Sequence, residues 1–141
     1  MNRIASKLGL LAAAGAMMLA GTAADARPRL TGEEQLAKLL EGRVAGQPVN
    51  CINLPNVQSS RVIDKTAIVY GSGSTIYVQR PKSGASSLNS DDILVTQLTT
   101  SQLCNIDVVQ LRDRNGWFWR GFVALDKFVP YTRPAKVALA D

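Results

Sequence analysis

The sequence AIVYGSGSTIYVQR, residues 67–80, places two strand-forming runs on either side of the glycine-containing segment Gly71–Ser74. A phosphate-binding loop would need its glycines to lead into a helix, whose free N–H groups and dipole hold the anion. Here Thr75–Val78 follows instead, and its β-branched and aromatic residues are typical of a strand. With Ser72-Gly73 as the loop, Val69 would face Ile76, and apolar partners would line up on both faces. The stretch therefore predicts a β-hairpin.

Short runs with a period of two continue on both sides of this hairpin and are separated by turn residues about every ten positions. One of these runs, residues 61–70, is expected to bend at Asp64-Lys65. This spacing is typical of a small antiparallel β-sandwich or barrel. We therefore predict a mainly β (α+β) fold. The expected strands are Val49–Leu54, Arg61–Tyr70, Ser74–Arg80, Ile93–Leu98, Asn105–Arg114 and Trp117–Leu125.

The segment TGEEQLAKLLEG, residues 31–42, predicts one short N-terminal helix. Thr31 at the N-cap and Glu34 three residues later form a capping box, and Gly42 suits the position after the C-cap. A helix this short depends on tertiary packing for its stability, so we expect its apolar stripe to dock on the β core. The stripe consists of Leu36, Leu39 and Leu40.

A second hairpin is predicted around Asn115-Gly116, the preferred pair for a type I′ turn. Pairing across this turn sets Val109 against Phe122 on one face. On the other face it sets two guanidinium groups beside two indoles, which would form a cation–π ladder. Such a ladder would stabilise and cover an exposed sheet face. Alternatively, the rings would bind a sugar, a peptide or an aromatic group. The candidate binding residues are Arg112, Arg114, Trp117 and Trp119.

The first 26 residues have the pattern of a signal peptide, with a basic start, an apolar run and small residues before Ala26. We expect cleavage after Ala26 and a periplasmic or secreted protein. The apolar run falls short of the roughly 20 strongly apolar residues that a spanning helix needs, so no stable membrane insertion is expected after cleavage. Residues 27–30 are predicted to be a flexible lead-in, 31–129 a single domain and 130–141 a flexible tail.

The two cysteines, Cys51 and Cys104, lie in the part of the chain expected to be exported. In an oxidising compartment two such cysteines most often form one disulfide, and we predict that these two are bonded.

Several chemistries are missing from the chain. It contains no histidine, which excludes Ser-His and Cys-His nucleophiles, and we expect neither a metal nor a cofactor. The adjacent Asp91 and Asp92 would point to opposite faces of a strand. The formal net charge is +5, with scattered charges that predict at most weak polyanion binding and no nucleic-acid site. A carboxylate hydrolase would require convergence of Asp64, Asp107 or Asp113 in a pocket.

Three segments, Cys51–Tyr70, Leu103–Leu111 and Gly121–Tyr131, contain in order Cys-Ile, Arg-x-Ile-Asp, Leu-Cys-x-x-Asp and Gly-x-Phe. Because it has these four motifs in this order, the chain resembles small exported proteobacterial proteins of a domain-of-unknown-function family. Family members often have two more cysteines, near the Lys82–Ala85 loop and near Arg120-Gly121. Both are absent here, which fits loss of one disulfide and retention of Cys51–Cys104. The resemblance implies the fold and export but no activity.

Export, the missing catalytic groups and the Arg/Trp hairpin together indicate a non-enzymatic domain that binds or supports an envelope protein or glycan. The first alternative is a weak binder of polyanions on the envelope surface, whose binding would depend strongly on salt. The second alternative is a cryptic carboxylate-dependent hydrolase.

Overall fold

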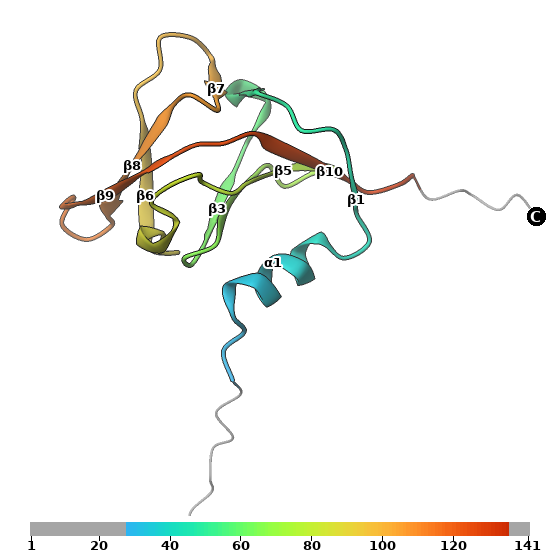
Figure 1. Cartoon of the computed structure of the whole chain (residues 1–141), viewed down its shortest axis with the longest axis horizontal. Coiled ribbons are helices and arrows are strands. Elements are labelled where there is room, and N and C mark those ends of the chain that lie inside the picture. Colours follow the sequence, from blue (N-terminus) through green and yellow to red (C-terminus); the bar gives the residue numbers. More distant parts are fainter. Residues whose placement is uncertain (1–27, 136–141) are drawn as a thin grey trace, which may run out of the picture.

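The computed structural model describes residues 28–135, and in this range ten strands form three antiparallel sheets beside one α-helix (Figure 1). The largest sheet has the order β1-β10-β5-β4-β3: β1 Val44–Ala45, β10 Phe128–Thr132, β5 Thr75–Gln79, β4 Ala67–Tyr70 and β3 Ser60–Ile63. A second sheet pairs β2 (Cys51–Asn53) with β7 (Gln102–Cys104). The third has the order β6-β8-β9: β6 Asp92–Thr96, β8 Val108–Asp113 and β9 Trp119–Ala124. The remaining elements are α1 Gly32–Leu40 and two 3-10 helices, η1 Leu54–Asn56 and η2 Ala85–Ser87.

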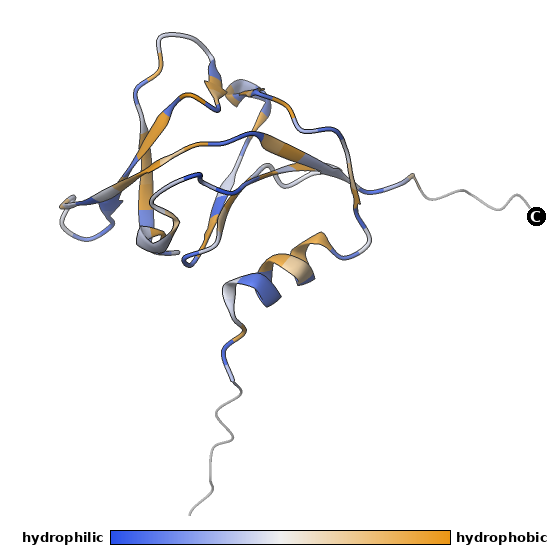
Figure 2. Cartoon of the chain, viewed as in Figure 1, coloured by the Kyte–Doolittle hydropathy of each residue, from blue (hydrophilic) through white to orange (hydrophobic). Residues whose placement is uncertain are grey.

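The predicted fold class is confirmed: the described residues form a mainly β sandwich with one short helix, and the strands do not close into a barrel. The five-stranded sheet packs one face against the other two sheets and the other face against α1. Strand β4 contributes to both layers, because Ile68 and Tyr70 point into the sandwich and Ala67 and Val69 point toward the helix. Hydrophobic residues accordingly follow the strands and the second half of α1 (Figure 2).

The N-terminal helix begins and ends as predicted. Thr31 Oγ1 accepts a hydrogen bond from the Glu34 N–H, and the Glu34 carboxylate accepts one from the Thr31 N–H, so the capping box is complete. Gly42 takes the left-handed conformation after the C-cap, with φ of 71°. The apolar stripe docks on the sheet through Leu36, which is 1% exposed.

The first hairpin forms, but its predicted register is wrong by two residues. Val69 lies opposite Val78 and not opposite Ile76. A shift of two keeps every side chain on its predicted face, because the period of a strand is two. The longer loop is held by Arg43, whose guanidinium donates to the carbonyl oxygens of Gly73 (3.1 Å) and Ser74 (2.7 Å). The glycine loop therefore presents carbonyl groups to a cation, which is the opposite of a phosphate cradle.

Two other expectations for the strands are wrong. The run 61–70 is a tight hairpin of β3 and β4 and not one bent strand, because Lys65 adopts a φ of 54° and Ile63 pairs with Ala67. The flexible tail expected from residue 130 does not begin there, since β10 continues to Thr132. Pro130 within β10 has no N–H to donate, and its carbonyl oxygen accepts a hydrogen bond from the Gly46 N–H (2.7 Å). Residues 136–141 lie outside the described part of the chain.

Candidate binding surface on the β8–β9 hairpin

The turn between β8 and β9 is built on Asp113. Its carboxylate oxygen Oδ1 accepts hydrogen bonds from the N–H groups of Asn115 (2.8 Å) and Gly116 (2.9 Å), and its carbonyl accepts one from Trp117 N–H (3.0 Å). The positive φ of this turn, 57°, falls on Trp117 and not on Asn115 or Gly116. The predicted type I′ turn is therefore wrong, because the aspartate side chain stabilises a longer loop.

A β-bulge follows the turn on the β9 side. Arg112 pairs with Trp119 as predicted, but Leu111 pairs with Gly121, so that Arg120 is an extra residue. Gly121 has a φ of 141°, a conformation that favours glycine. Beyond the bulge the register of β9 is shifted by one residue. A shift of one residue moves each following side chain to the opposite face of the sheet.

This change of register decides where Phe122 lies. Val109 faces Val123 in the core, whereas Phe122 lies opposite Gln110 on the outward face of the sheet. The prediction that Phe122 faces Val109 is therefore wrong, and sequence reasoning missed Phe122 as a surface residue. The isolated Gly121 inside a strand pattern is a known sign of a bulge and could have indicated it.

Four exposed aromatic side chains lie on strand β9 or in the turn that precedes it. We call them the aromatic face: Trp117 (60% exposed), Phe118 (73%), Trp119 (61%) and Phe122 (51%). The exposed Val108 lies on the same outward side of β8. Trp117 and Trp119, the tryptophans named as candidates from the sequence, are thus both exposed. Helix α1 packs against the five-stranded sheet, away from this hairpin (Figure 1).

The two predicted arginines do not stack on the indoles. Arg112 donates to the Trp117 carbonyl (3.2 Å) and to Gln110 Oε1 (3.3 Å), and Arg114 donates to the Asp91 carbonyl (3.4 Å). Within residues 28–135 no cation–π pair is present, so the ladder prediction is wrong. The hydrogen bonds of Arg112 and Arg114 stabilise the turn, and neither guanidinium stacks on an indole ring.

A third arginine, Arg120, connects the hairpin to the neighbouring strand β6 by an ion pair. The bulge directs Arg120 toward β6, where its Nε lies 3.1 Å from Asp92 Oδ1 and its Nη1 lies 3.8 Å from Asp113 Oδ2. Asp92 and Asp113 are direct cross-strand partners, and the Asp92 side chain is only 1% exposed. Burial raises the pKa of the Asp92 carboxyl, and Arg120 opposes this rise. Hydrogen bonds from Gly116 and Asn115 lower the pKa of Asp113. This cluster links all three strands beneath the aromatic face.

The carboxylates considered for hydrolysis have structural hydrogen bonds. Asp64 Oδ1 accepts from Ser90 N–H (2.6 Å), Asp107 Oδ2 accepts from Cys104 N–H (2.7 Å), and Asp113 holds the hairpin turn. No three His, Cys, Asp or Glu residues of the described chain form a group that could hold a metal ion. Sequence reasoning missed the pairing of Asp92 with Asp113, because it considered Asp92 only beside Asp91.

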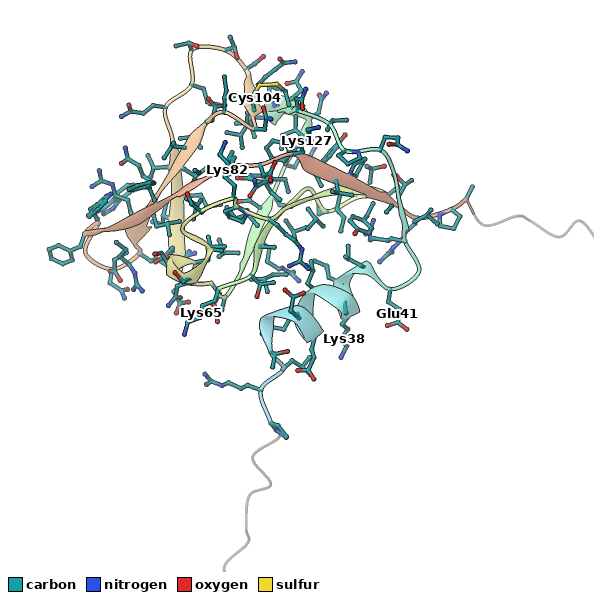
Figure 3. The ribbon with its side chains drawn as sticks, viewed as in Figure 1. Lys38, Glu41, Lys65, Lys82, Cys104 and Lys127 are labelled. Carbon is teal, nitrogen blue, oxygen red and sulfur yellow. A yellow bond between two sulfur atoms is a disulfide. The ribbon has the colours of Figure 1, made fainter. Side chains whose placement is uncertain are left out.

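The predicted disulfide is confirmed. Cys51 and Cys104 are direct partners of β2 and β7, and their sulfur atoms are bonded (Figure 3). A disulfide fits an oxidising compartment. Among residues 28–135 no helix is long and apolar enough to cross a membrane. The signal peptide and the cleavage after Ala26 lie outside the described residues and stay predictions.

Comparison of the chain with protein-family models, with curated proteins and with solved structures gives no match. The resemblance to exported proteins of unknown function therefore stays a prediction. The functional argument consequently depends on the geometry of the hairpin.

Proposed function

We propose that this protein is a non-enzymatic, exported binding domain of the cell envelope, and that the aromatic face docks an envelope protein in the periplasm. The observation that carries the proposal is the exposure of four aromatic side chains on one hairpin, each more than half accessible to solvent. Large contiguous exposed apolar patches are rare on monomeric proteins and mark interaction sites.

The composition of the outward surface favours a protein partner over a glycan or a polyanion. Protein interfaces are enriched in Trp, Phe and Arg and depleted in Lys and Glu. The outward positions of β8 hold Val108, Gln110 and Arg112, and neither β8 nor β9 contains a lysine or a glutamate. Aliphatic Val108 beside the rings extends an apolar contact area, which a protein partner uses better than a hydroxylated sugar does. The nearby cation Arg120 is already paired with carboxylates.

The backbone of Trp117 supports the same conclusion. A left-handed conformation costs a residue other than glycine about 1–2 kcal/mol, and Trp117 adopts it with φ of 57°. Glycine or asparagine usually adopts this conformation in a turn, but here a large apolar residue adopts it and stays 60% exposed. Burial in the isolated domain gives Trp117 little in return, so a role in binding is the better explanation.

The test compares three forms of the exported protein after in vivo crosslinking in the envelope. Trp119→Ala with Phe122→Ala removes two rings, and Val44→Ala removes an aliphatic side chain of similar exposure (63%) at the distant strand β1. We expect one defined protein to crosslink to the wild type and to Val44→Ala, and its yield to fall at least tenfold in the aromatic double variant. Equal crosslinking of all three forms would contradict the proposal.

Raising the salt concentration distinguishes this proposal from the first alternative, a weak polyanion binder. A protein docked through apolar rings stays bound when salt is raised to about 0.5 M, whereas a polyanion bound by scattered charges dissociates. Retention of the captured protein at high salt therefore supports the aromatic face. Complete release at high salt, together with unchanged capture by the aromatic variant, would favour the polyanion binder.

A further inference from the structure

We propose a second binding site, distinct from the aromatic face: the groove between strands β3 and β6, where an extended acidic peptide binds as an added β-strand. Both strands lie at the edge of their sheets, because within residues 28–135 β3 pairs only with β4 and β6 only with β8. The groove has a volume of about 590 Å³ and is lined by residues of both strands. No residue of the aromatic face lines it, so the site is independent of the proposed function.

The hydrogen-bond pattern of β3 leaves main-chain groups unpaired on the side of the groove. In an antiparallel pair, residues that exchange hydrogen bonds with the partner strand alternate with residues whose N–H and C=O groups point away from it. The Gly71 N–H donates to the Ser59 carbonyl (2.7 Å), so Arg61 is the next residue that bonds to β4. The N–H and C=O groups of Ser60 and Val62 therefore point away from β4, and both residues line the groove.

Strand β6 has unpaired main-chain groups on its facing edge as well. Asp92 and Asp113 lie opposite each other but are not a hydrogen-bonded pair, because both N–H groups donate to turn carbonyls, at 3.0 and 2.9 Å. Leu94 and Thr96 alternate in the same phase as Asp92, so their main-chain groups point away from β8. Within residues 28–135 no hydrogen bond joins β3 to β6. Such open edges are what an extended peptide pairs with when it adds to a sheet.

The two edges are linked at one end, so the groove is formed before a peptide binds. Asp64 Oδ1 accepts a hydrogen bond from the Ser90 N–H (2.6 Å), and the Lys65 N–H donates to the Leu88 carbonyl (3.0 Å). Strand β3 runs toward this link and β6 runs away from it, since Asp64 directly follows β3 and Ser90 precedes β6. A preformed groove lowers the ordering cost of binding, which the peptide alone would then have to meet.

The alternation of side chains along both strands predicts the sequence pattern of the peptide. Val62 belongs to the main core and Leu94 packs against it, so these side chains lie on the inward face of the sandwich. Every second side chain of an added strand would point to the same face and extend this apolar contact. The intervening side chains would point outward beside Arg61, which lies opposite Val69 on the outer face of the five-stranded sheet.

The charge of the groove makes these outward positions acidic. Arg61 and Arg114 line the groove, and neither forms an ion pair within residues 28–135. The third charged residue of the lining is Asp92, whose buried carboxylate is paired with Arg120. The unpaired charge is therefore positive, and complementary charge steers and orients a binding partner. A peptide that alternates apolar and acidic residues fits both the faces and the charge of the groove.

The probe is a blocked hexapeptide of alternating valine and glutamate, titrated into the folded protein while amide hydrogen exchange is followed by NMR. One control peptide has lysine in place of glutamate, and the other is N-methylated at every second residue, which removes main-chain donors. The amide of Arg61 already bonds to β4 and serves as an internal reference. We expect only the unmethylated glutamate peptide to slow exchange, about tenfold or more, because four N–H groups gain acceptors. These groups belong to Ser60, Val62, Leu94 and Thr96.

Variants of the β3 edge test the main-chain pairing directly. Ser60→Pro removes an N–H that points away from β4, so the sheet itself keeps its hydrogen bonds, and Ser60→Ala is the matched control that retains this N–H. We expect Ser60→Pro to weaken binding of the glutamate peptide about fivefold or more and Ser60→Ala to leave it unchanged. Arg61→Gln should weaken it about two- to fivefold, the effect of one exposed ion pair. All three variants should melt within about 5 °C of the wild type.

Several results would overturn the site. Unchanged exchange at either edge strand, or equal binding of the N-methylated peptide, would exclude strand addition. Slow exchange of the Ser60 and Val62 amides without peptide would show that the chain itself already covers the edge. A dimer of the protein alone that Ser60→Pro abolishes would assign the edge to a second copy. Trp119→Ala with Phe122→Ala should bind the peptide like the wild type, and loss of binding in that variant would place the peptide on the aromatic face instead.

Discussion

Replacement of Arg120 by methionine tests the ion cluster that holds the aromatic hairpin in place. Methionine keeps much of the length and apolar stem of arginine but removes the charge that lies 3.1 Å from Asp92. The carboxylate of Asp92, 1% exposed, would then be buried without a partner. Asp113 would lose a more distant contact and keep its two backbone hydrogen bonds.

The structure limits the magnitude of this effect. Removal of one partner from a fully buried ion pair costs about 3–5 kcal/mol. The Arg120 side chain is 40% exposed, so water already screens its charge, and we expect a loss of about 2 kcal/mol at neutral pH. For a domain of about 100 residues this corresponds to a decrease in Tm of roughly 8–15 °C.

The pH dependence has a definite sign. Burial raises the pKa of Asp92 in the folded state, so the folded protein binds this proton more tightly than the unfolded chain does. Stability from this group is therefore highest below its unfolded pKa and falls as the pH rises through its folded pKa. Without Arg120 the pKa of Asp92 rises further. We expect the variant to lose more stability at pH 7 than at pH 4, measured by urea denaturation relative to the wild type at each pH.

Two controls identify the cause. Lys127→Met removes one exposed positive charge elsewhere and should change stability by less than about 0.5 kcal/mol at either pH. Asp92→Asn added to Arg120→Met removes the buried charge and should cancel most of the extra loss at pH 7. If Arg120→Met is equally destabilised at both pH values, or if the double variant keeps the same pH dependence, the buried-charge argument is wrong.

The remaining predictions concern the disulfide, the strained tryptophan and the N-terminus. Cys51→Ala with Cys104→Ala opens a loop with a sequence separation of 53 and should lower the unfolding free energy by about 4 kcal/mol, seen as a decrease in Tm of roughly 15 °C or more; a change of only a few degrees would contradict this. Trp117→Gly should be more stable in urea than Trp117→Ala by about 1 kcal/mol, because only glycine relaxes the positive φ; the usual order, with alanine more stable, would refute the strain. Mass spectrometry of exported protein should find Arg27 as the first residue, and an intact or lipidated N-terminus would refute the predicted cleavage.

Features that depend on neighbouring residues were predictable from the sequence. The helix follows from Thr31, Glu34 and Gly42, because capping bonds and left-handed turns involve residues only a few positions apart. The mainly β fold follows from the period of two in the apolar residues. The disulfide follows from the presence of only two cysteines, since no alternative pairing exists within one chain. The hairpin around Asn115-Gly116 also follows from local residues, but the exposure of both Trp117 and Trp119 was established only by the structure.

Features that depend on the packing of distant residues required the tertiary structure. Trp119 and Phe122 share a face only because a bulge inserts Arg120 and so turns Val123 into the core. Local propensity hardly distinguishes the two registers, since either places a large apolar residue next to β8. The energy that separates them comes from burial of Val123 and from pairing of Arg120 with Asp92 on another strand. Local residues thus determine which segments become strands, and contacts between distant strands decide which side chains those strands expose.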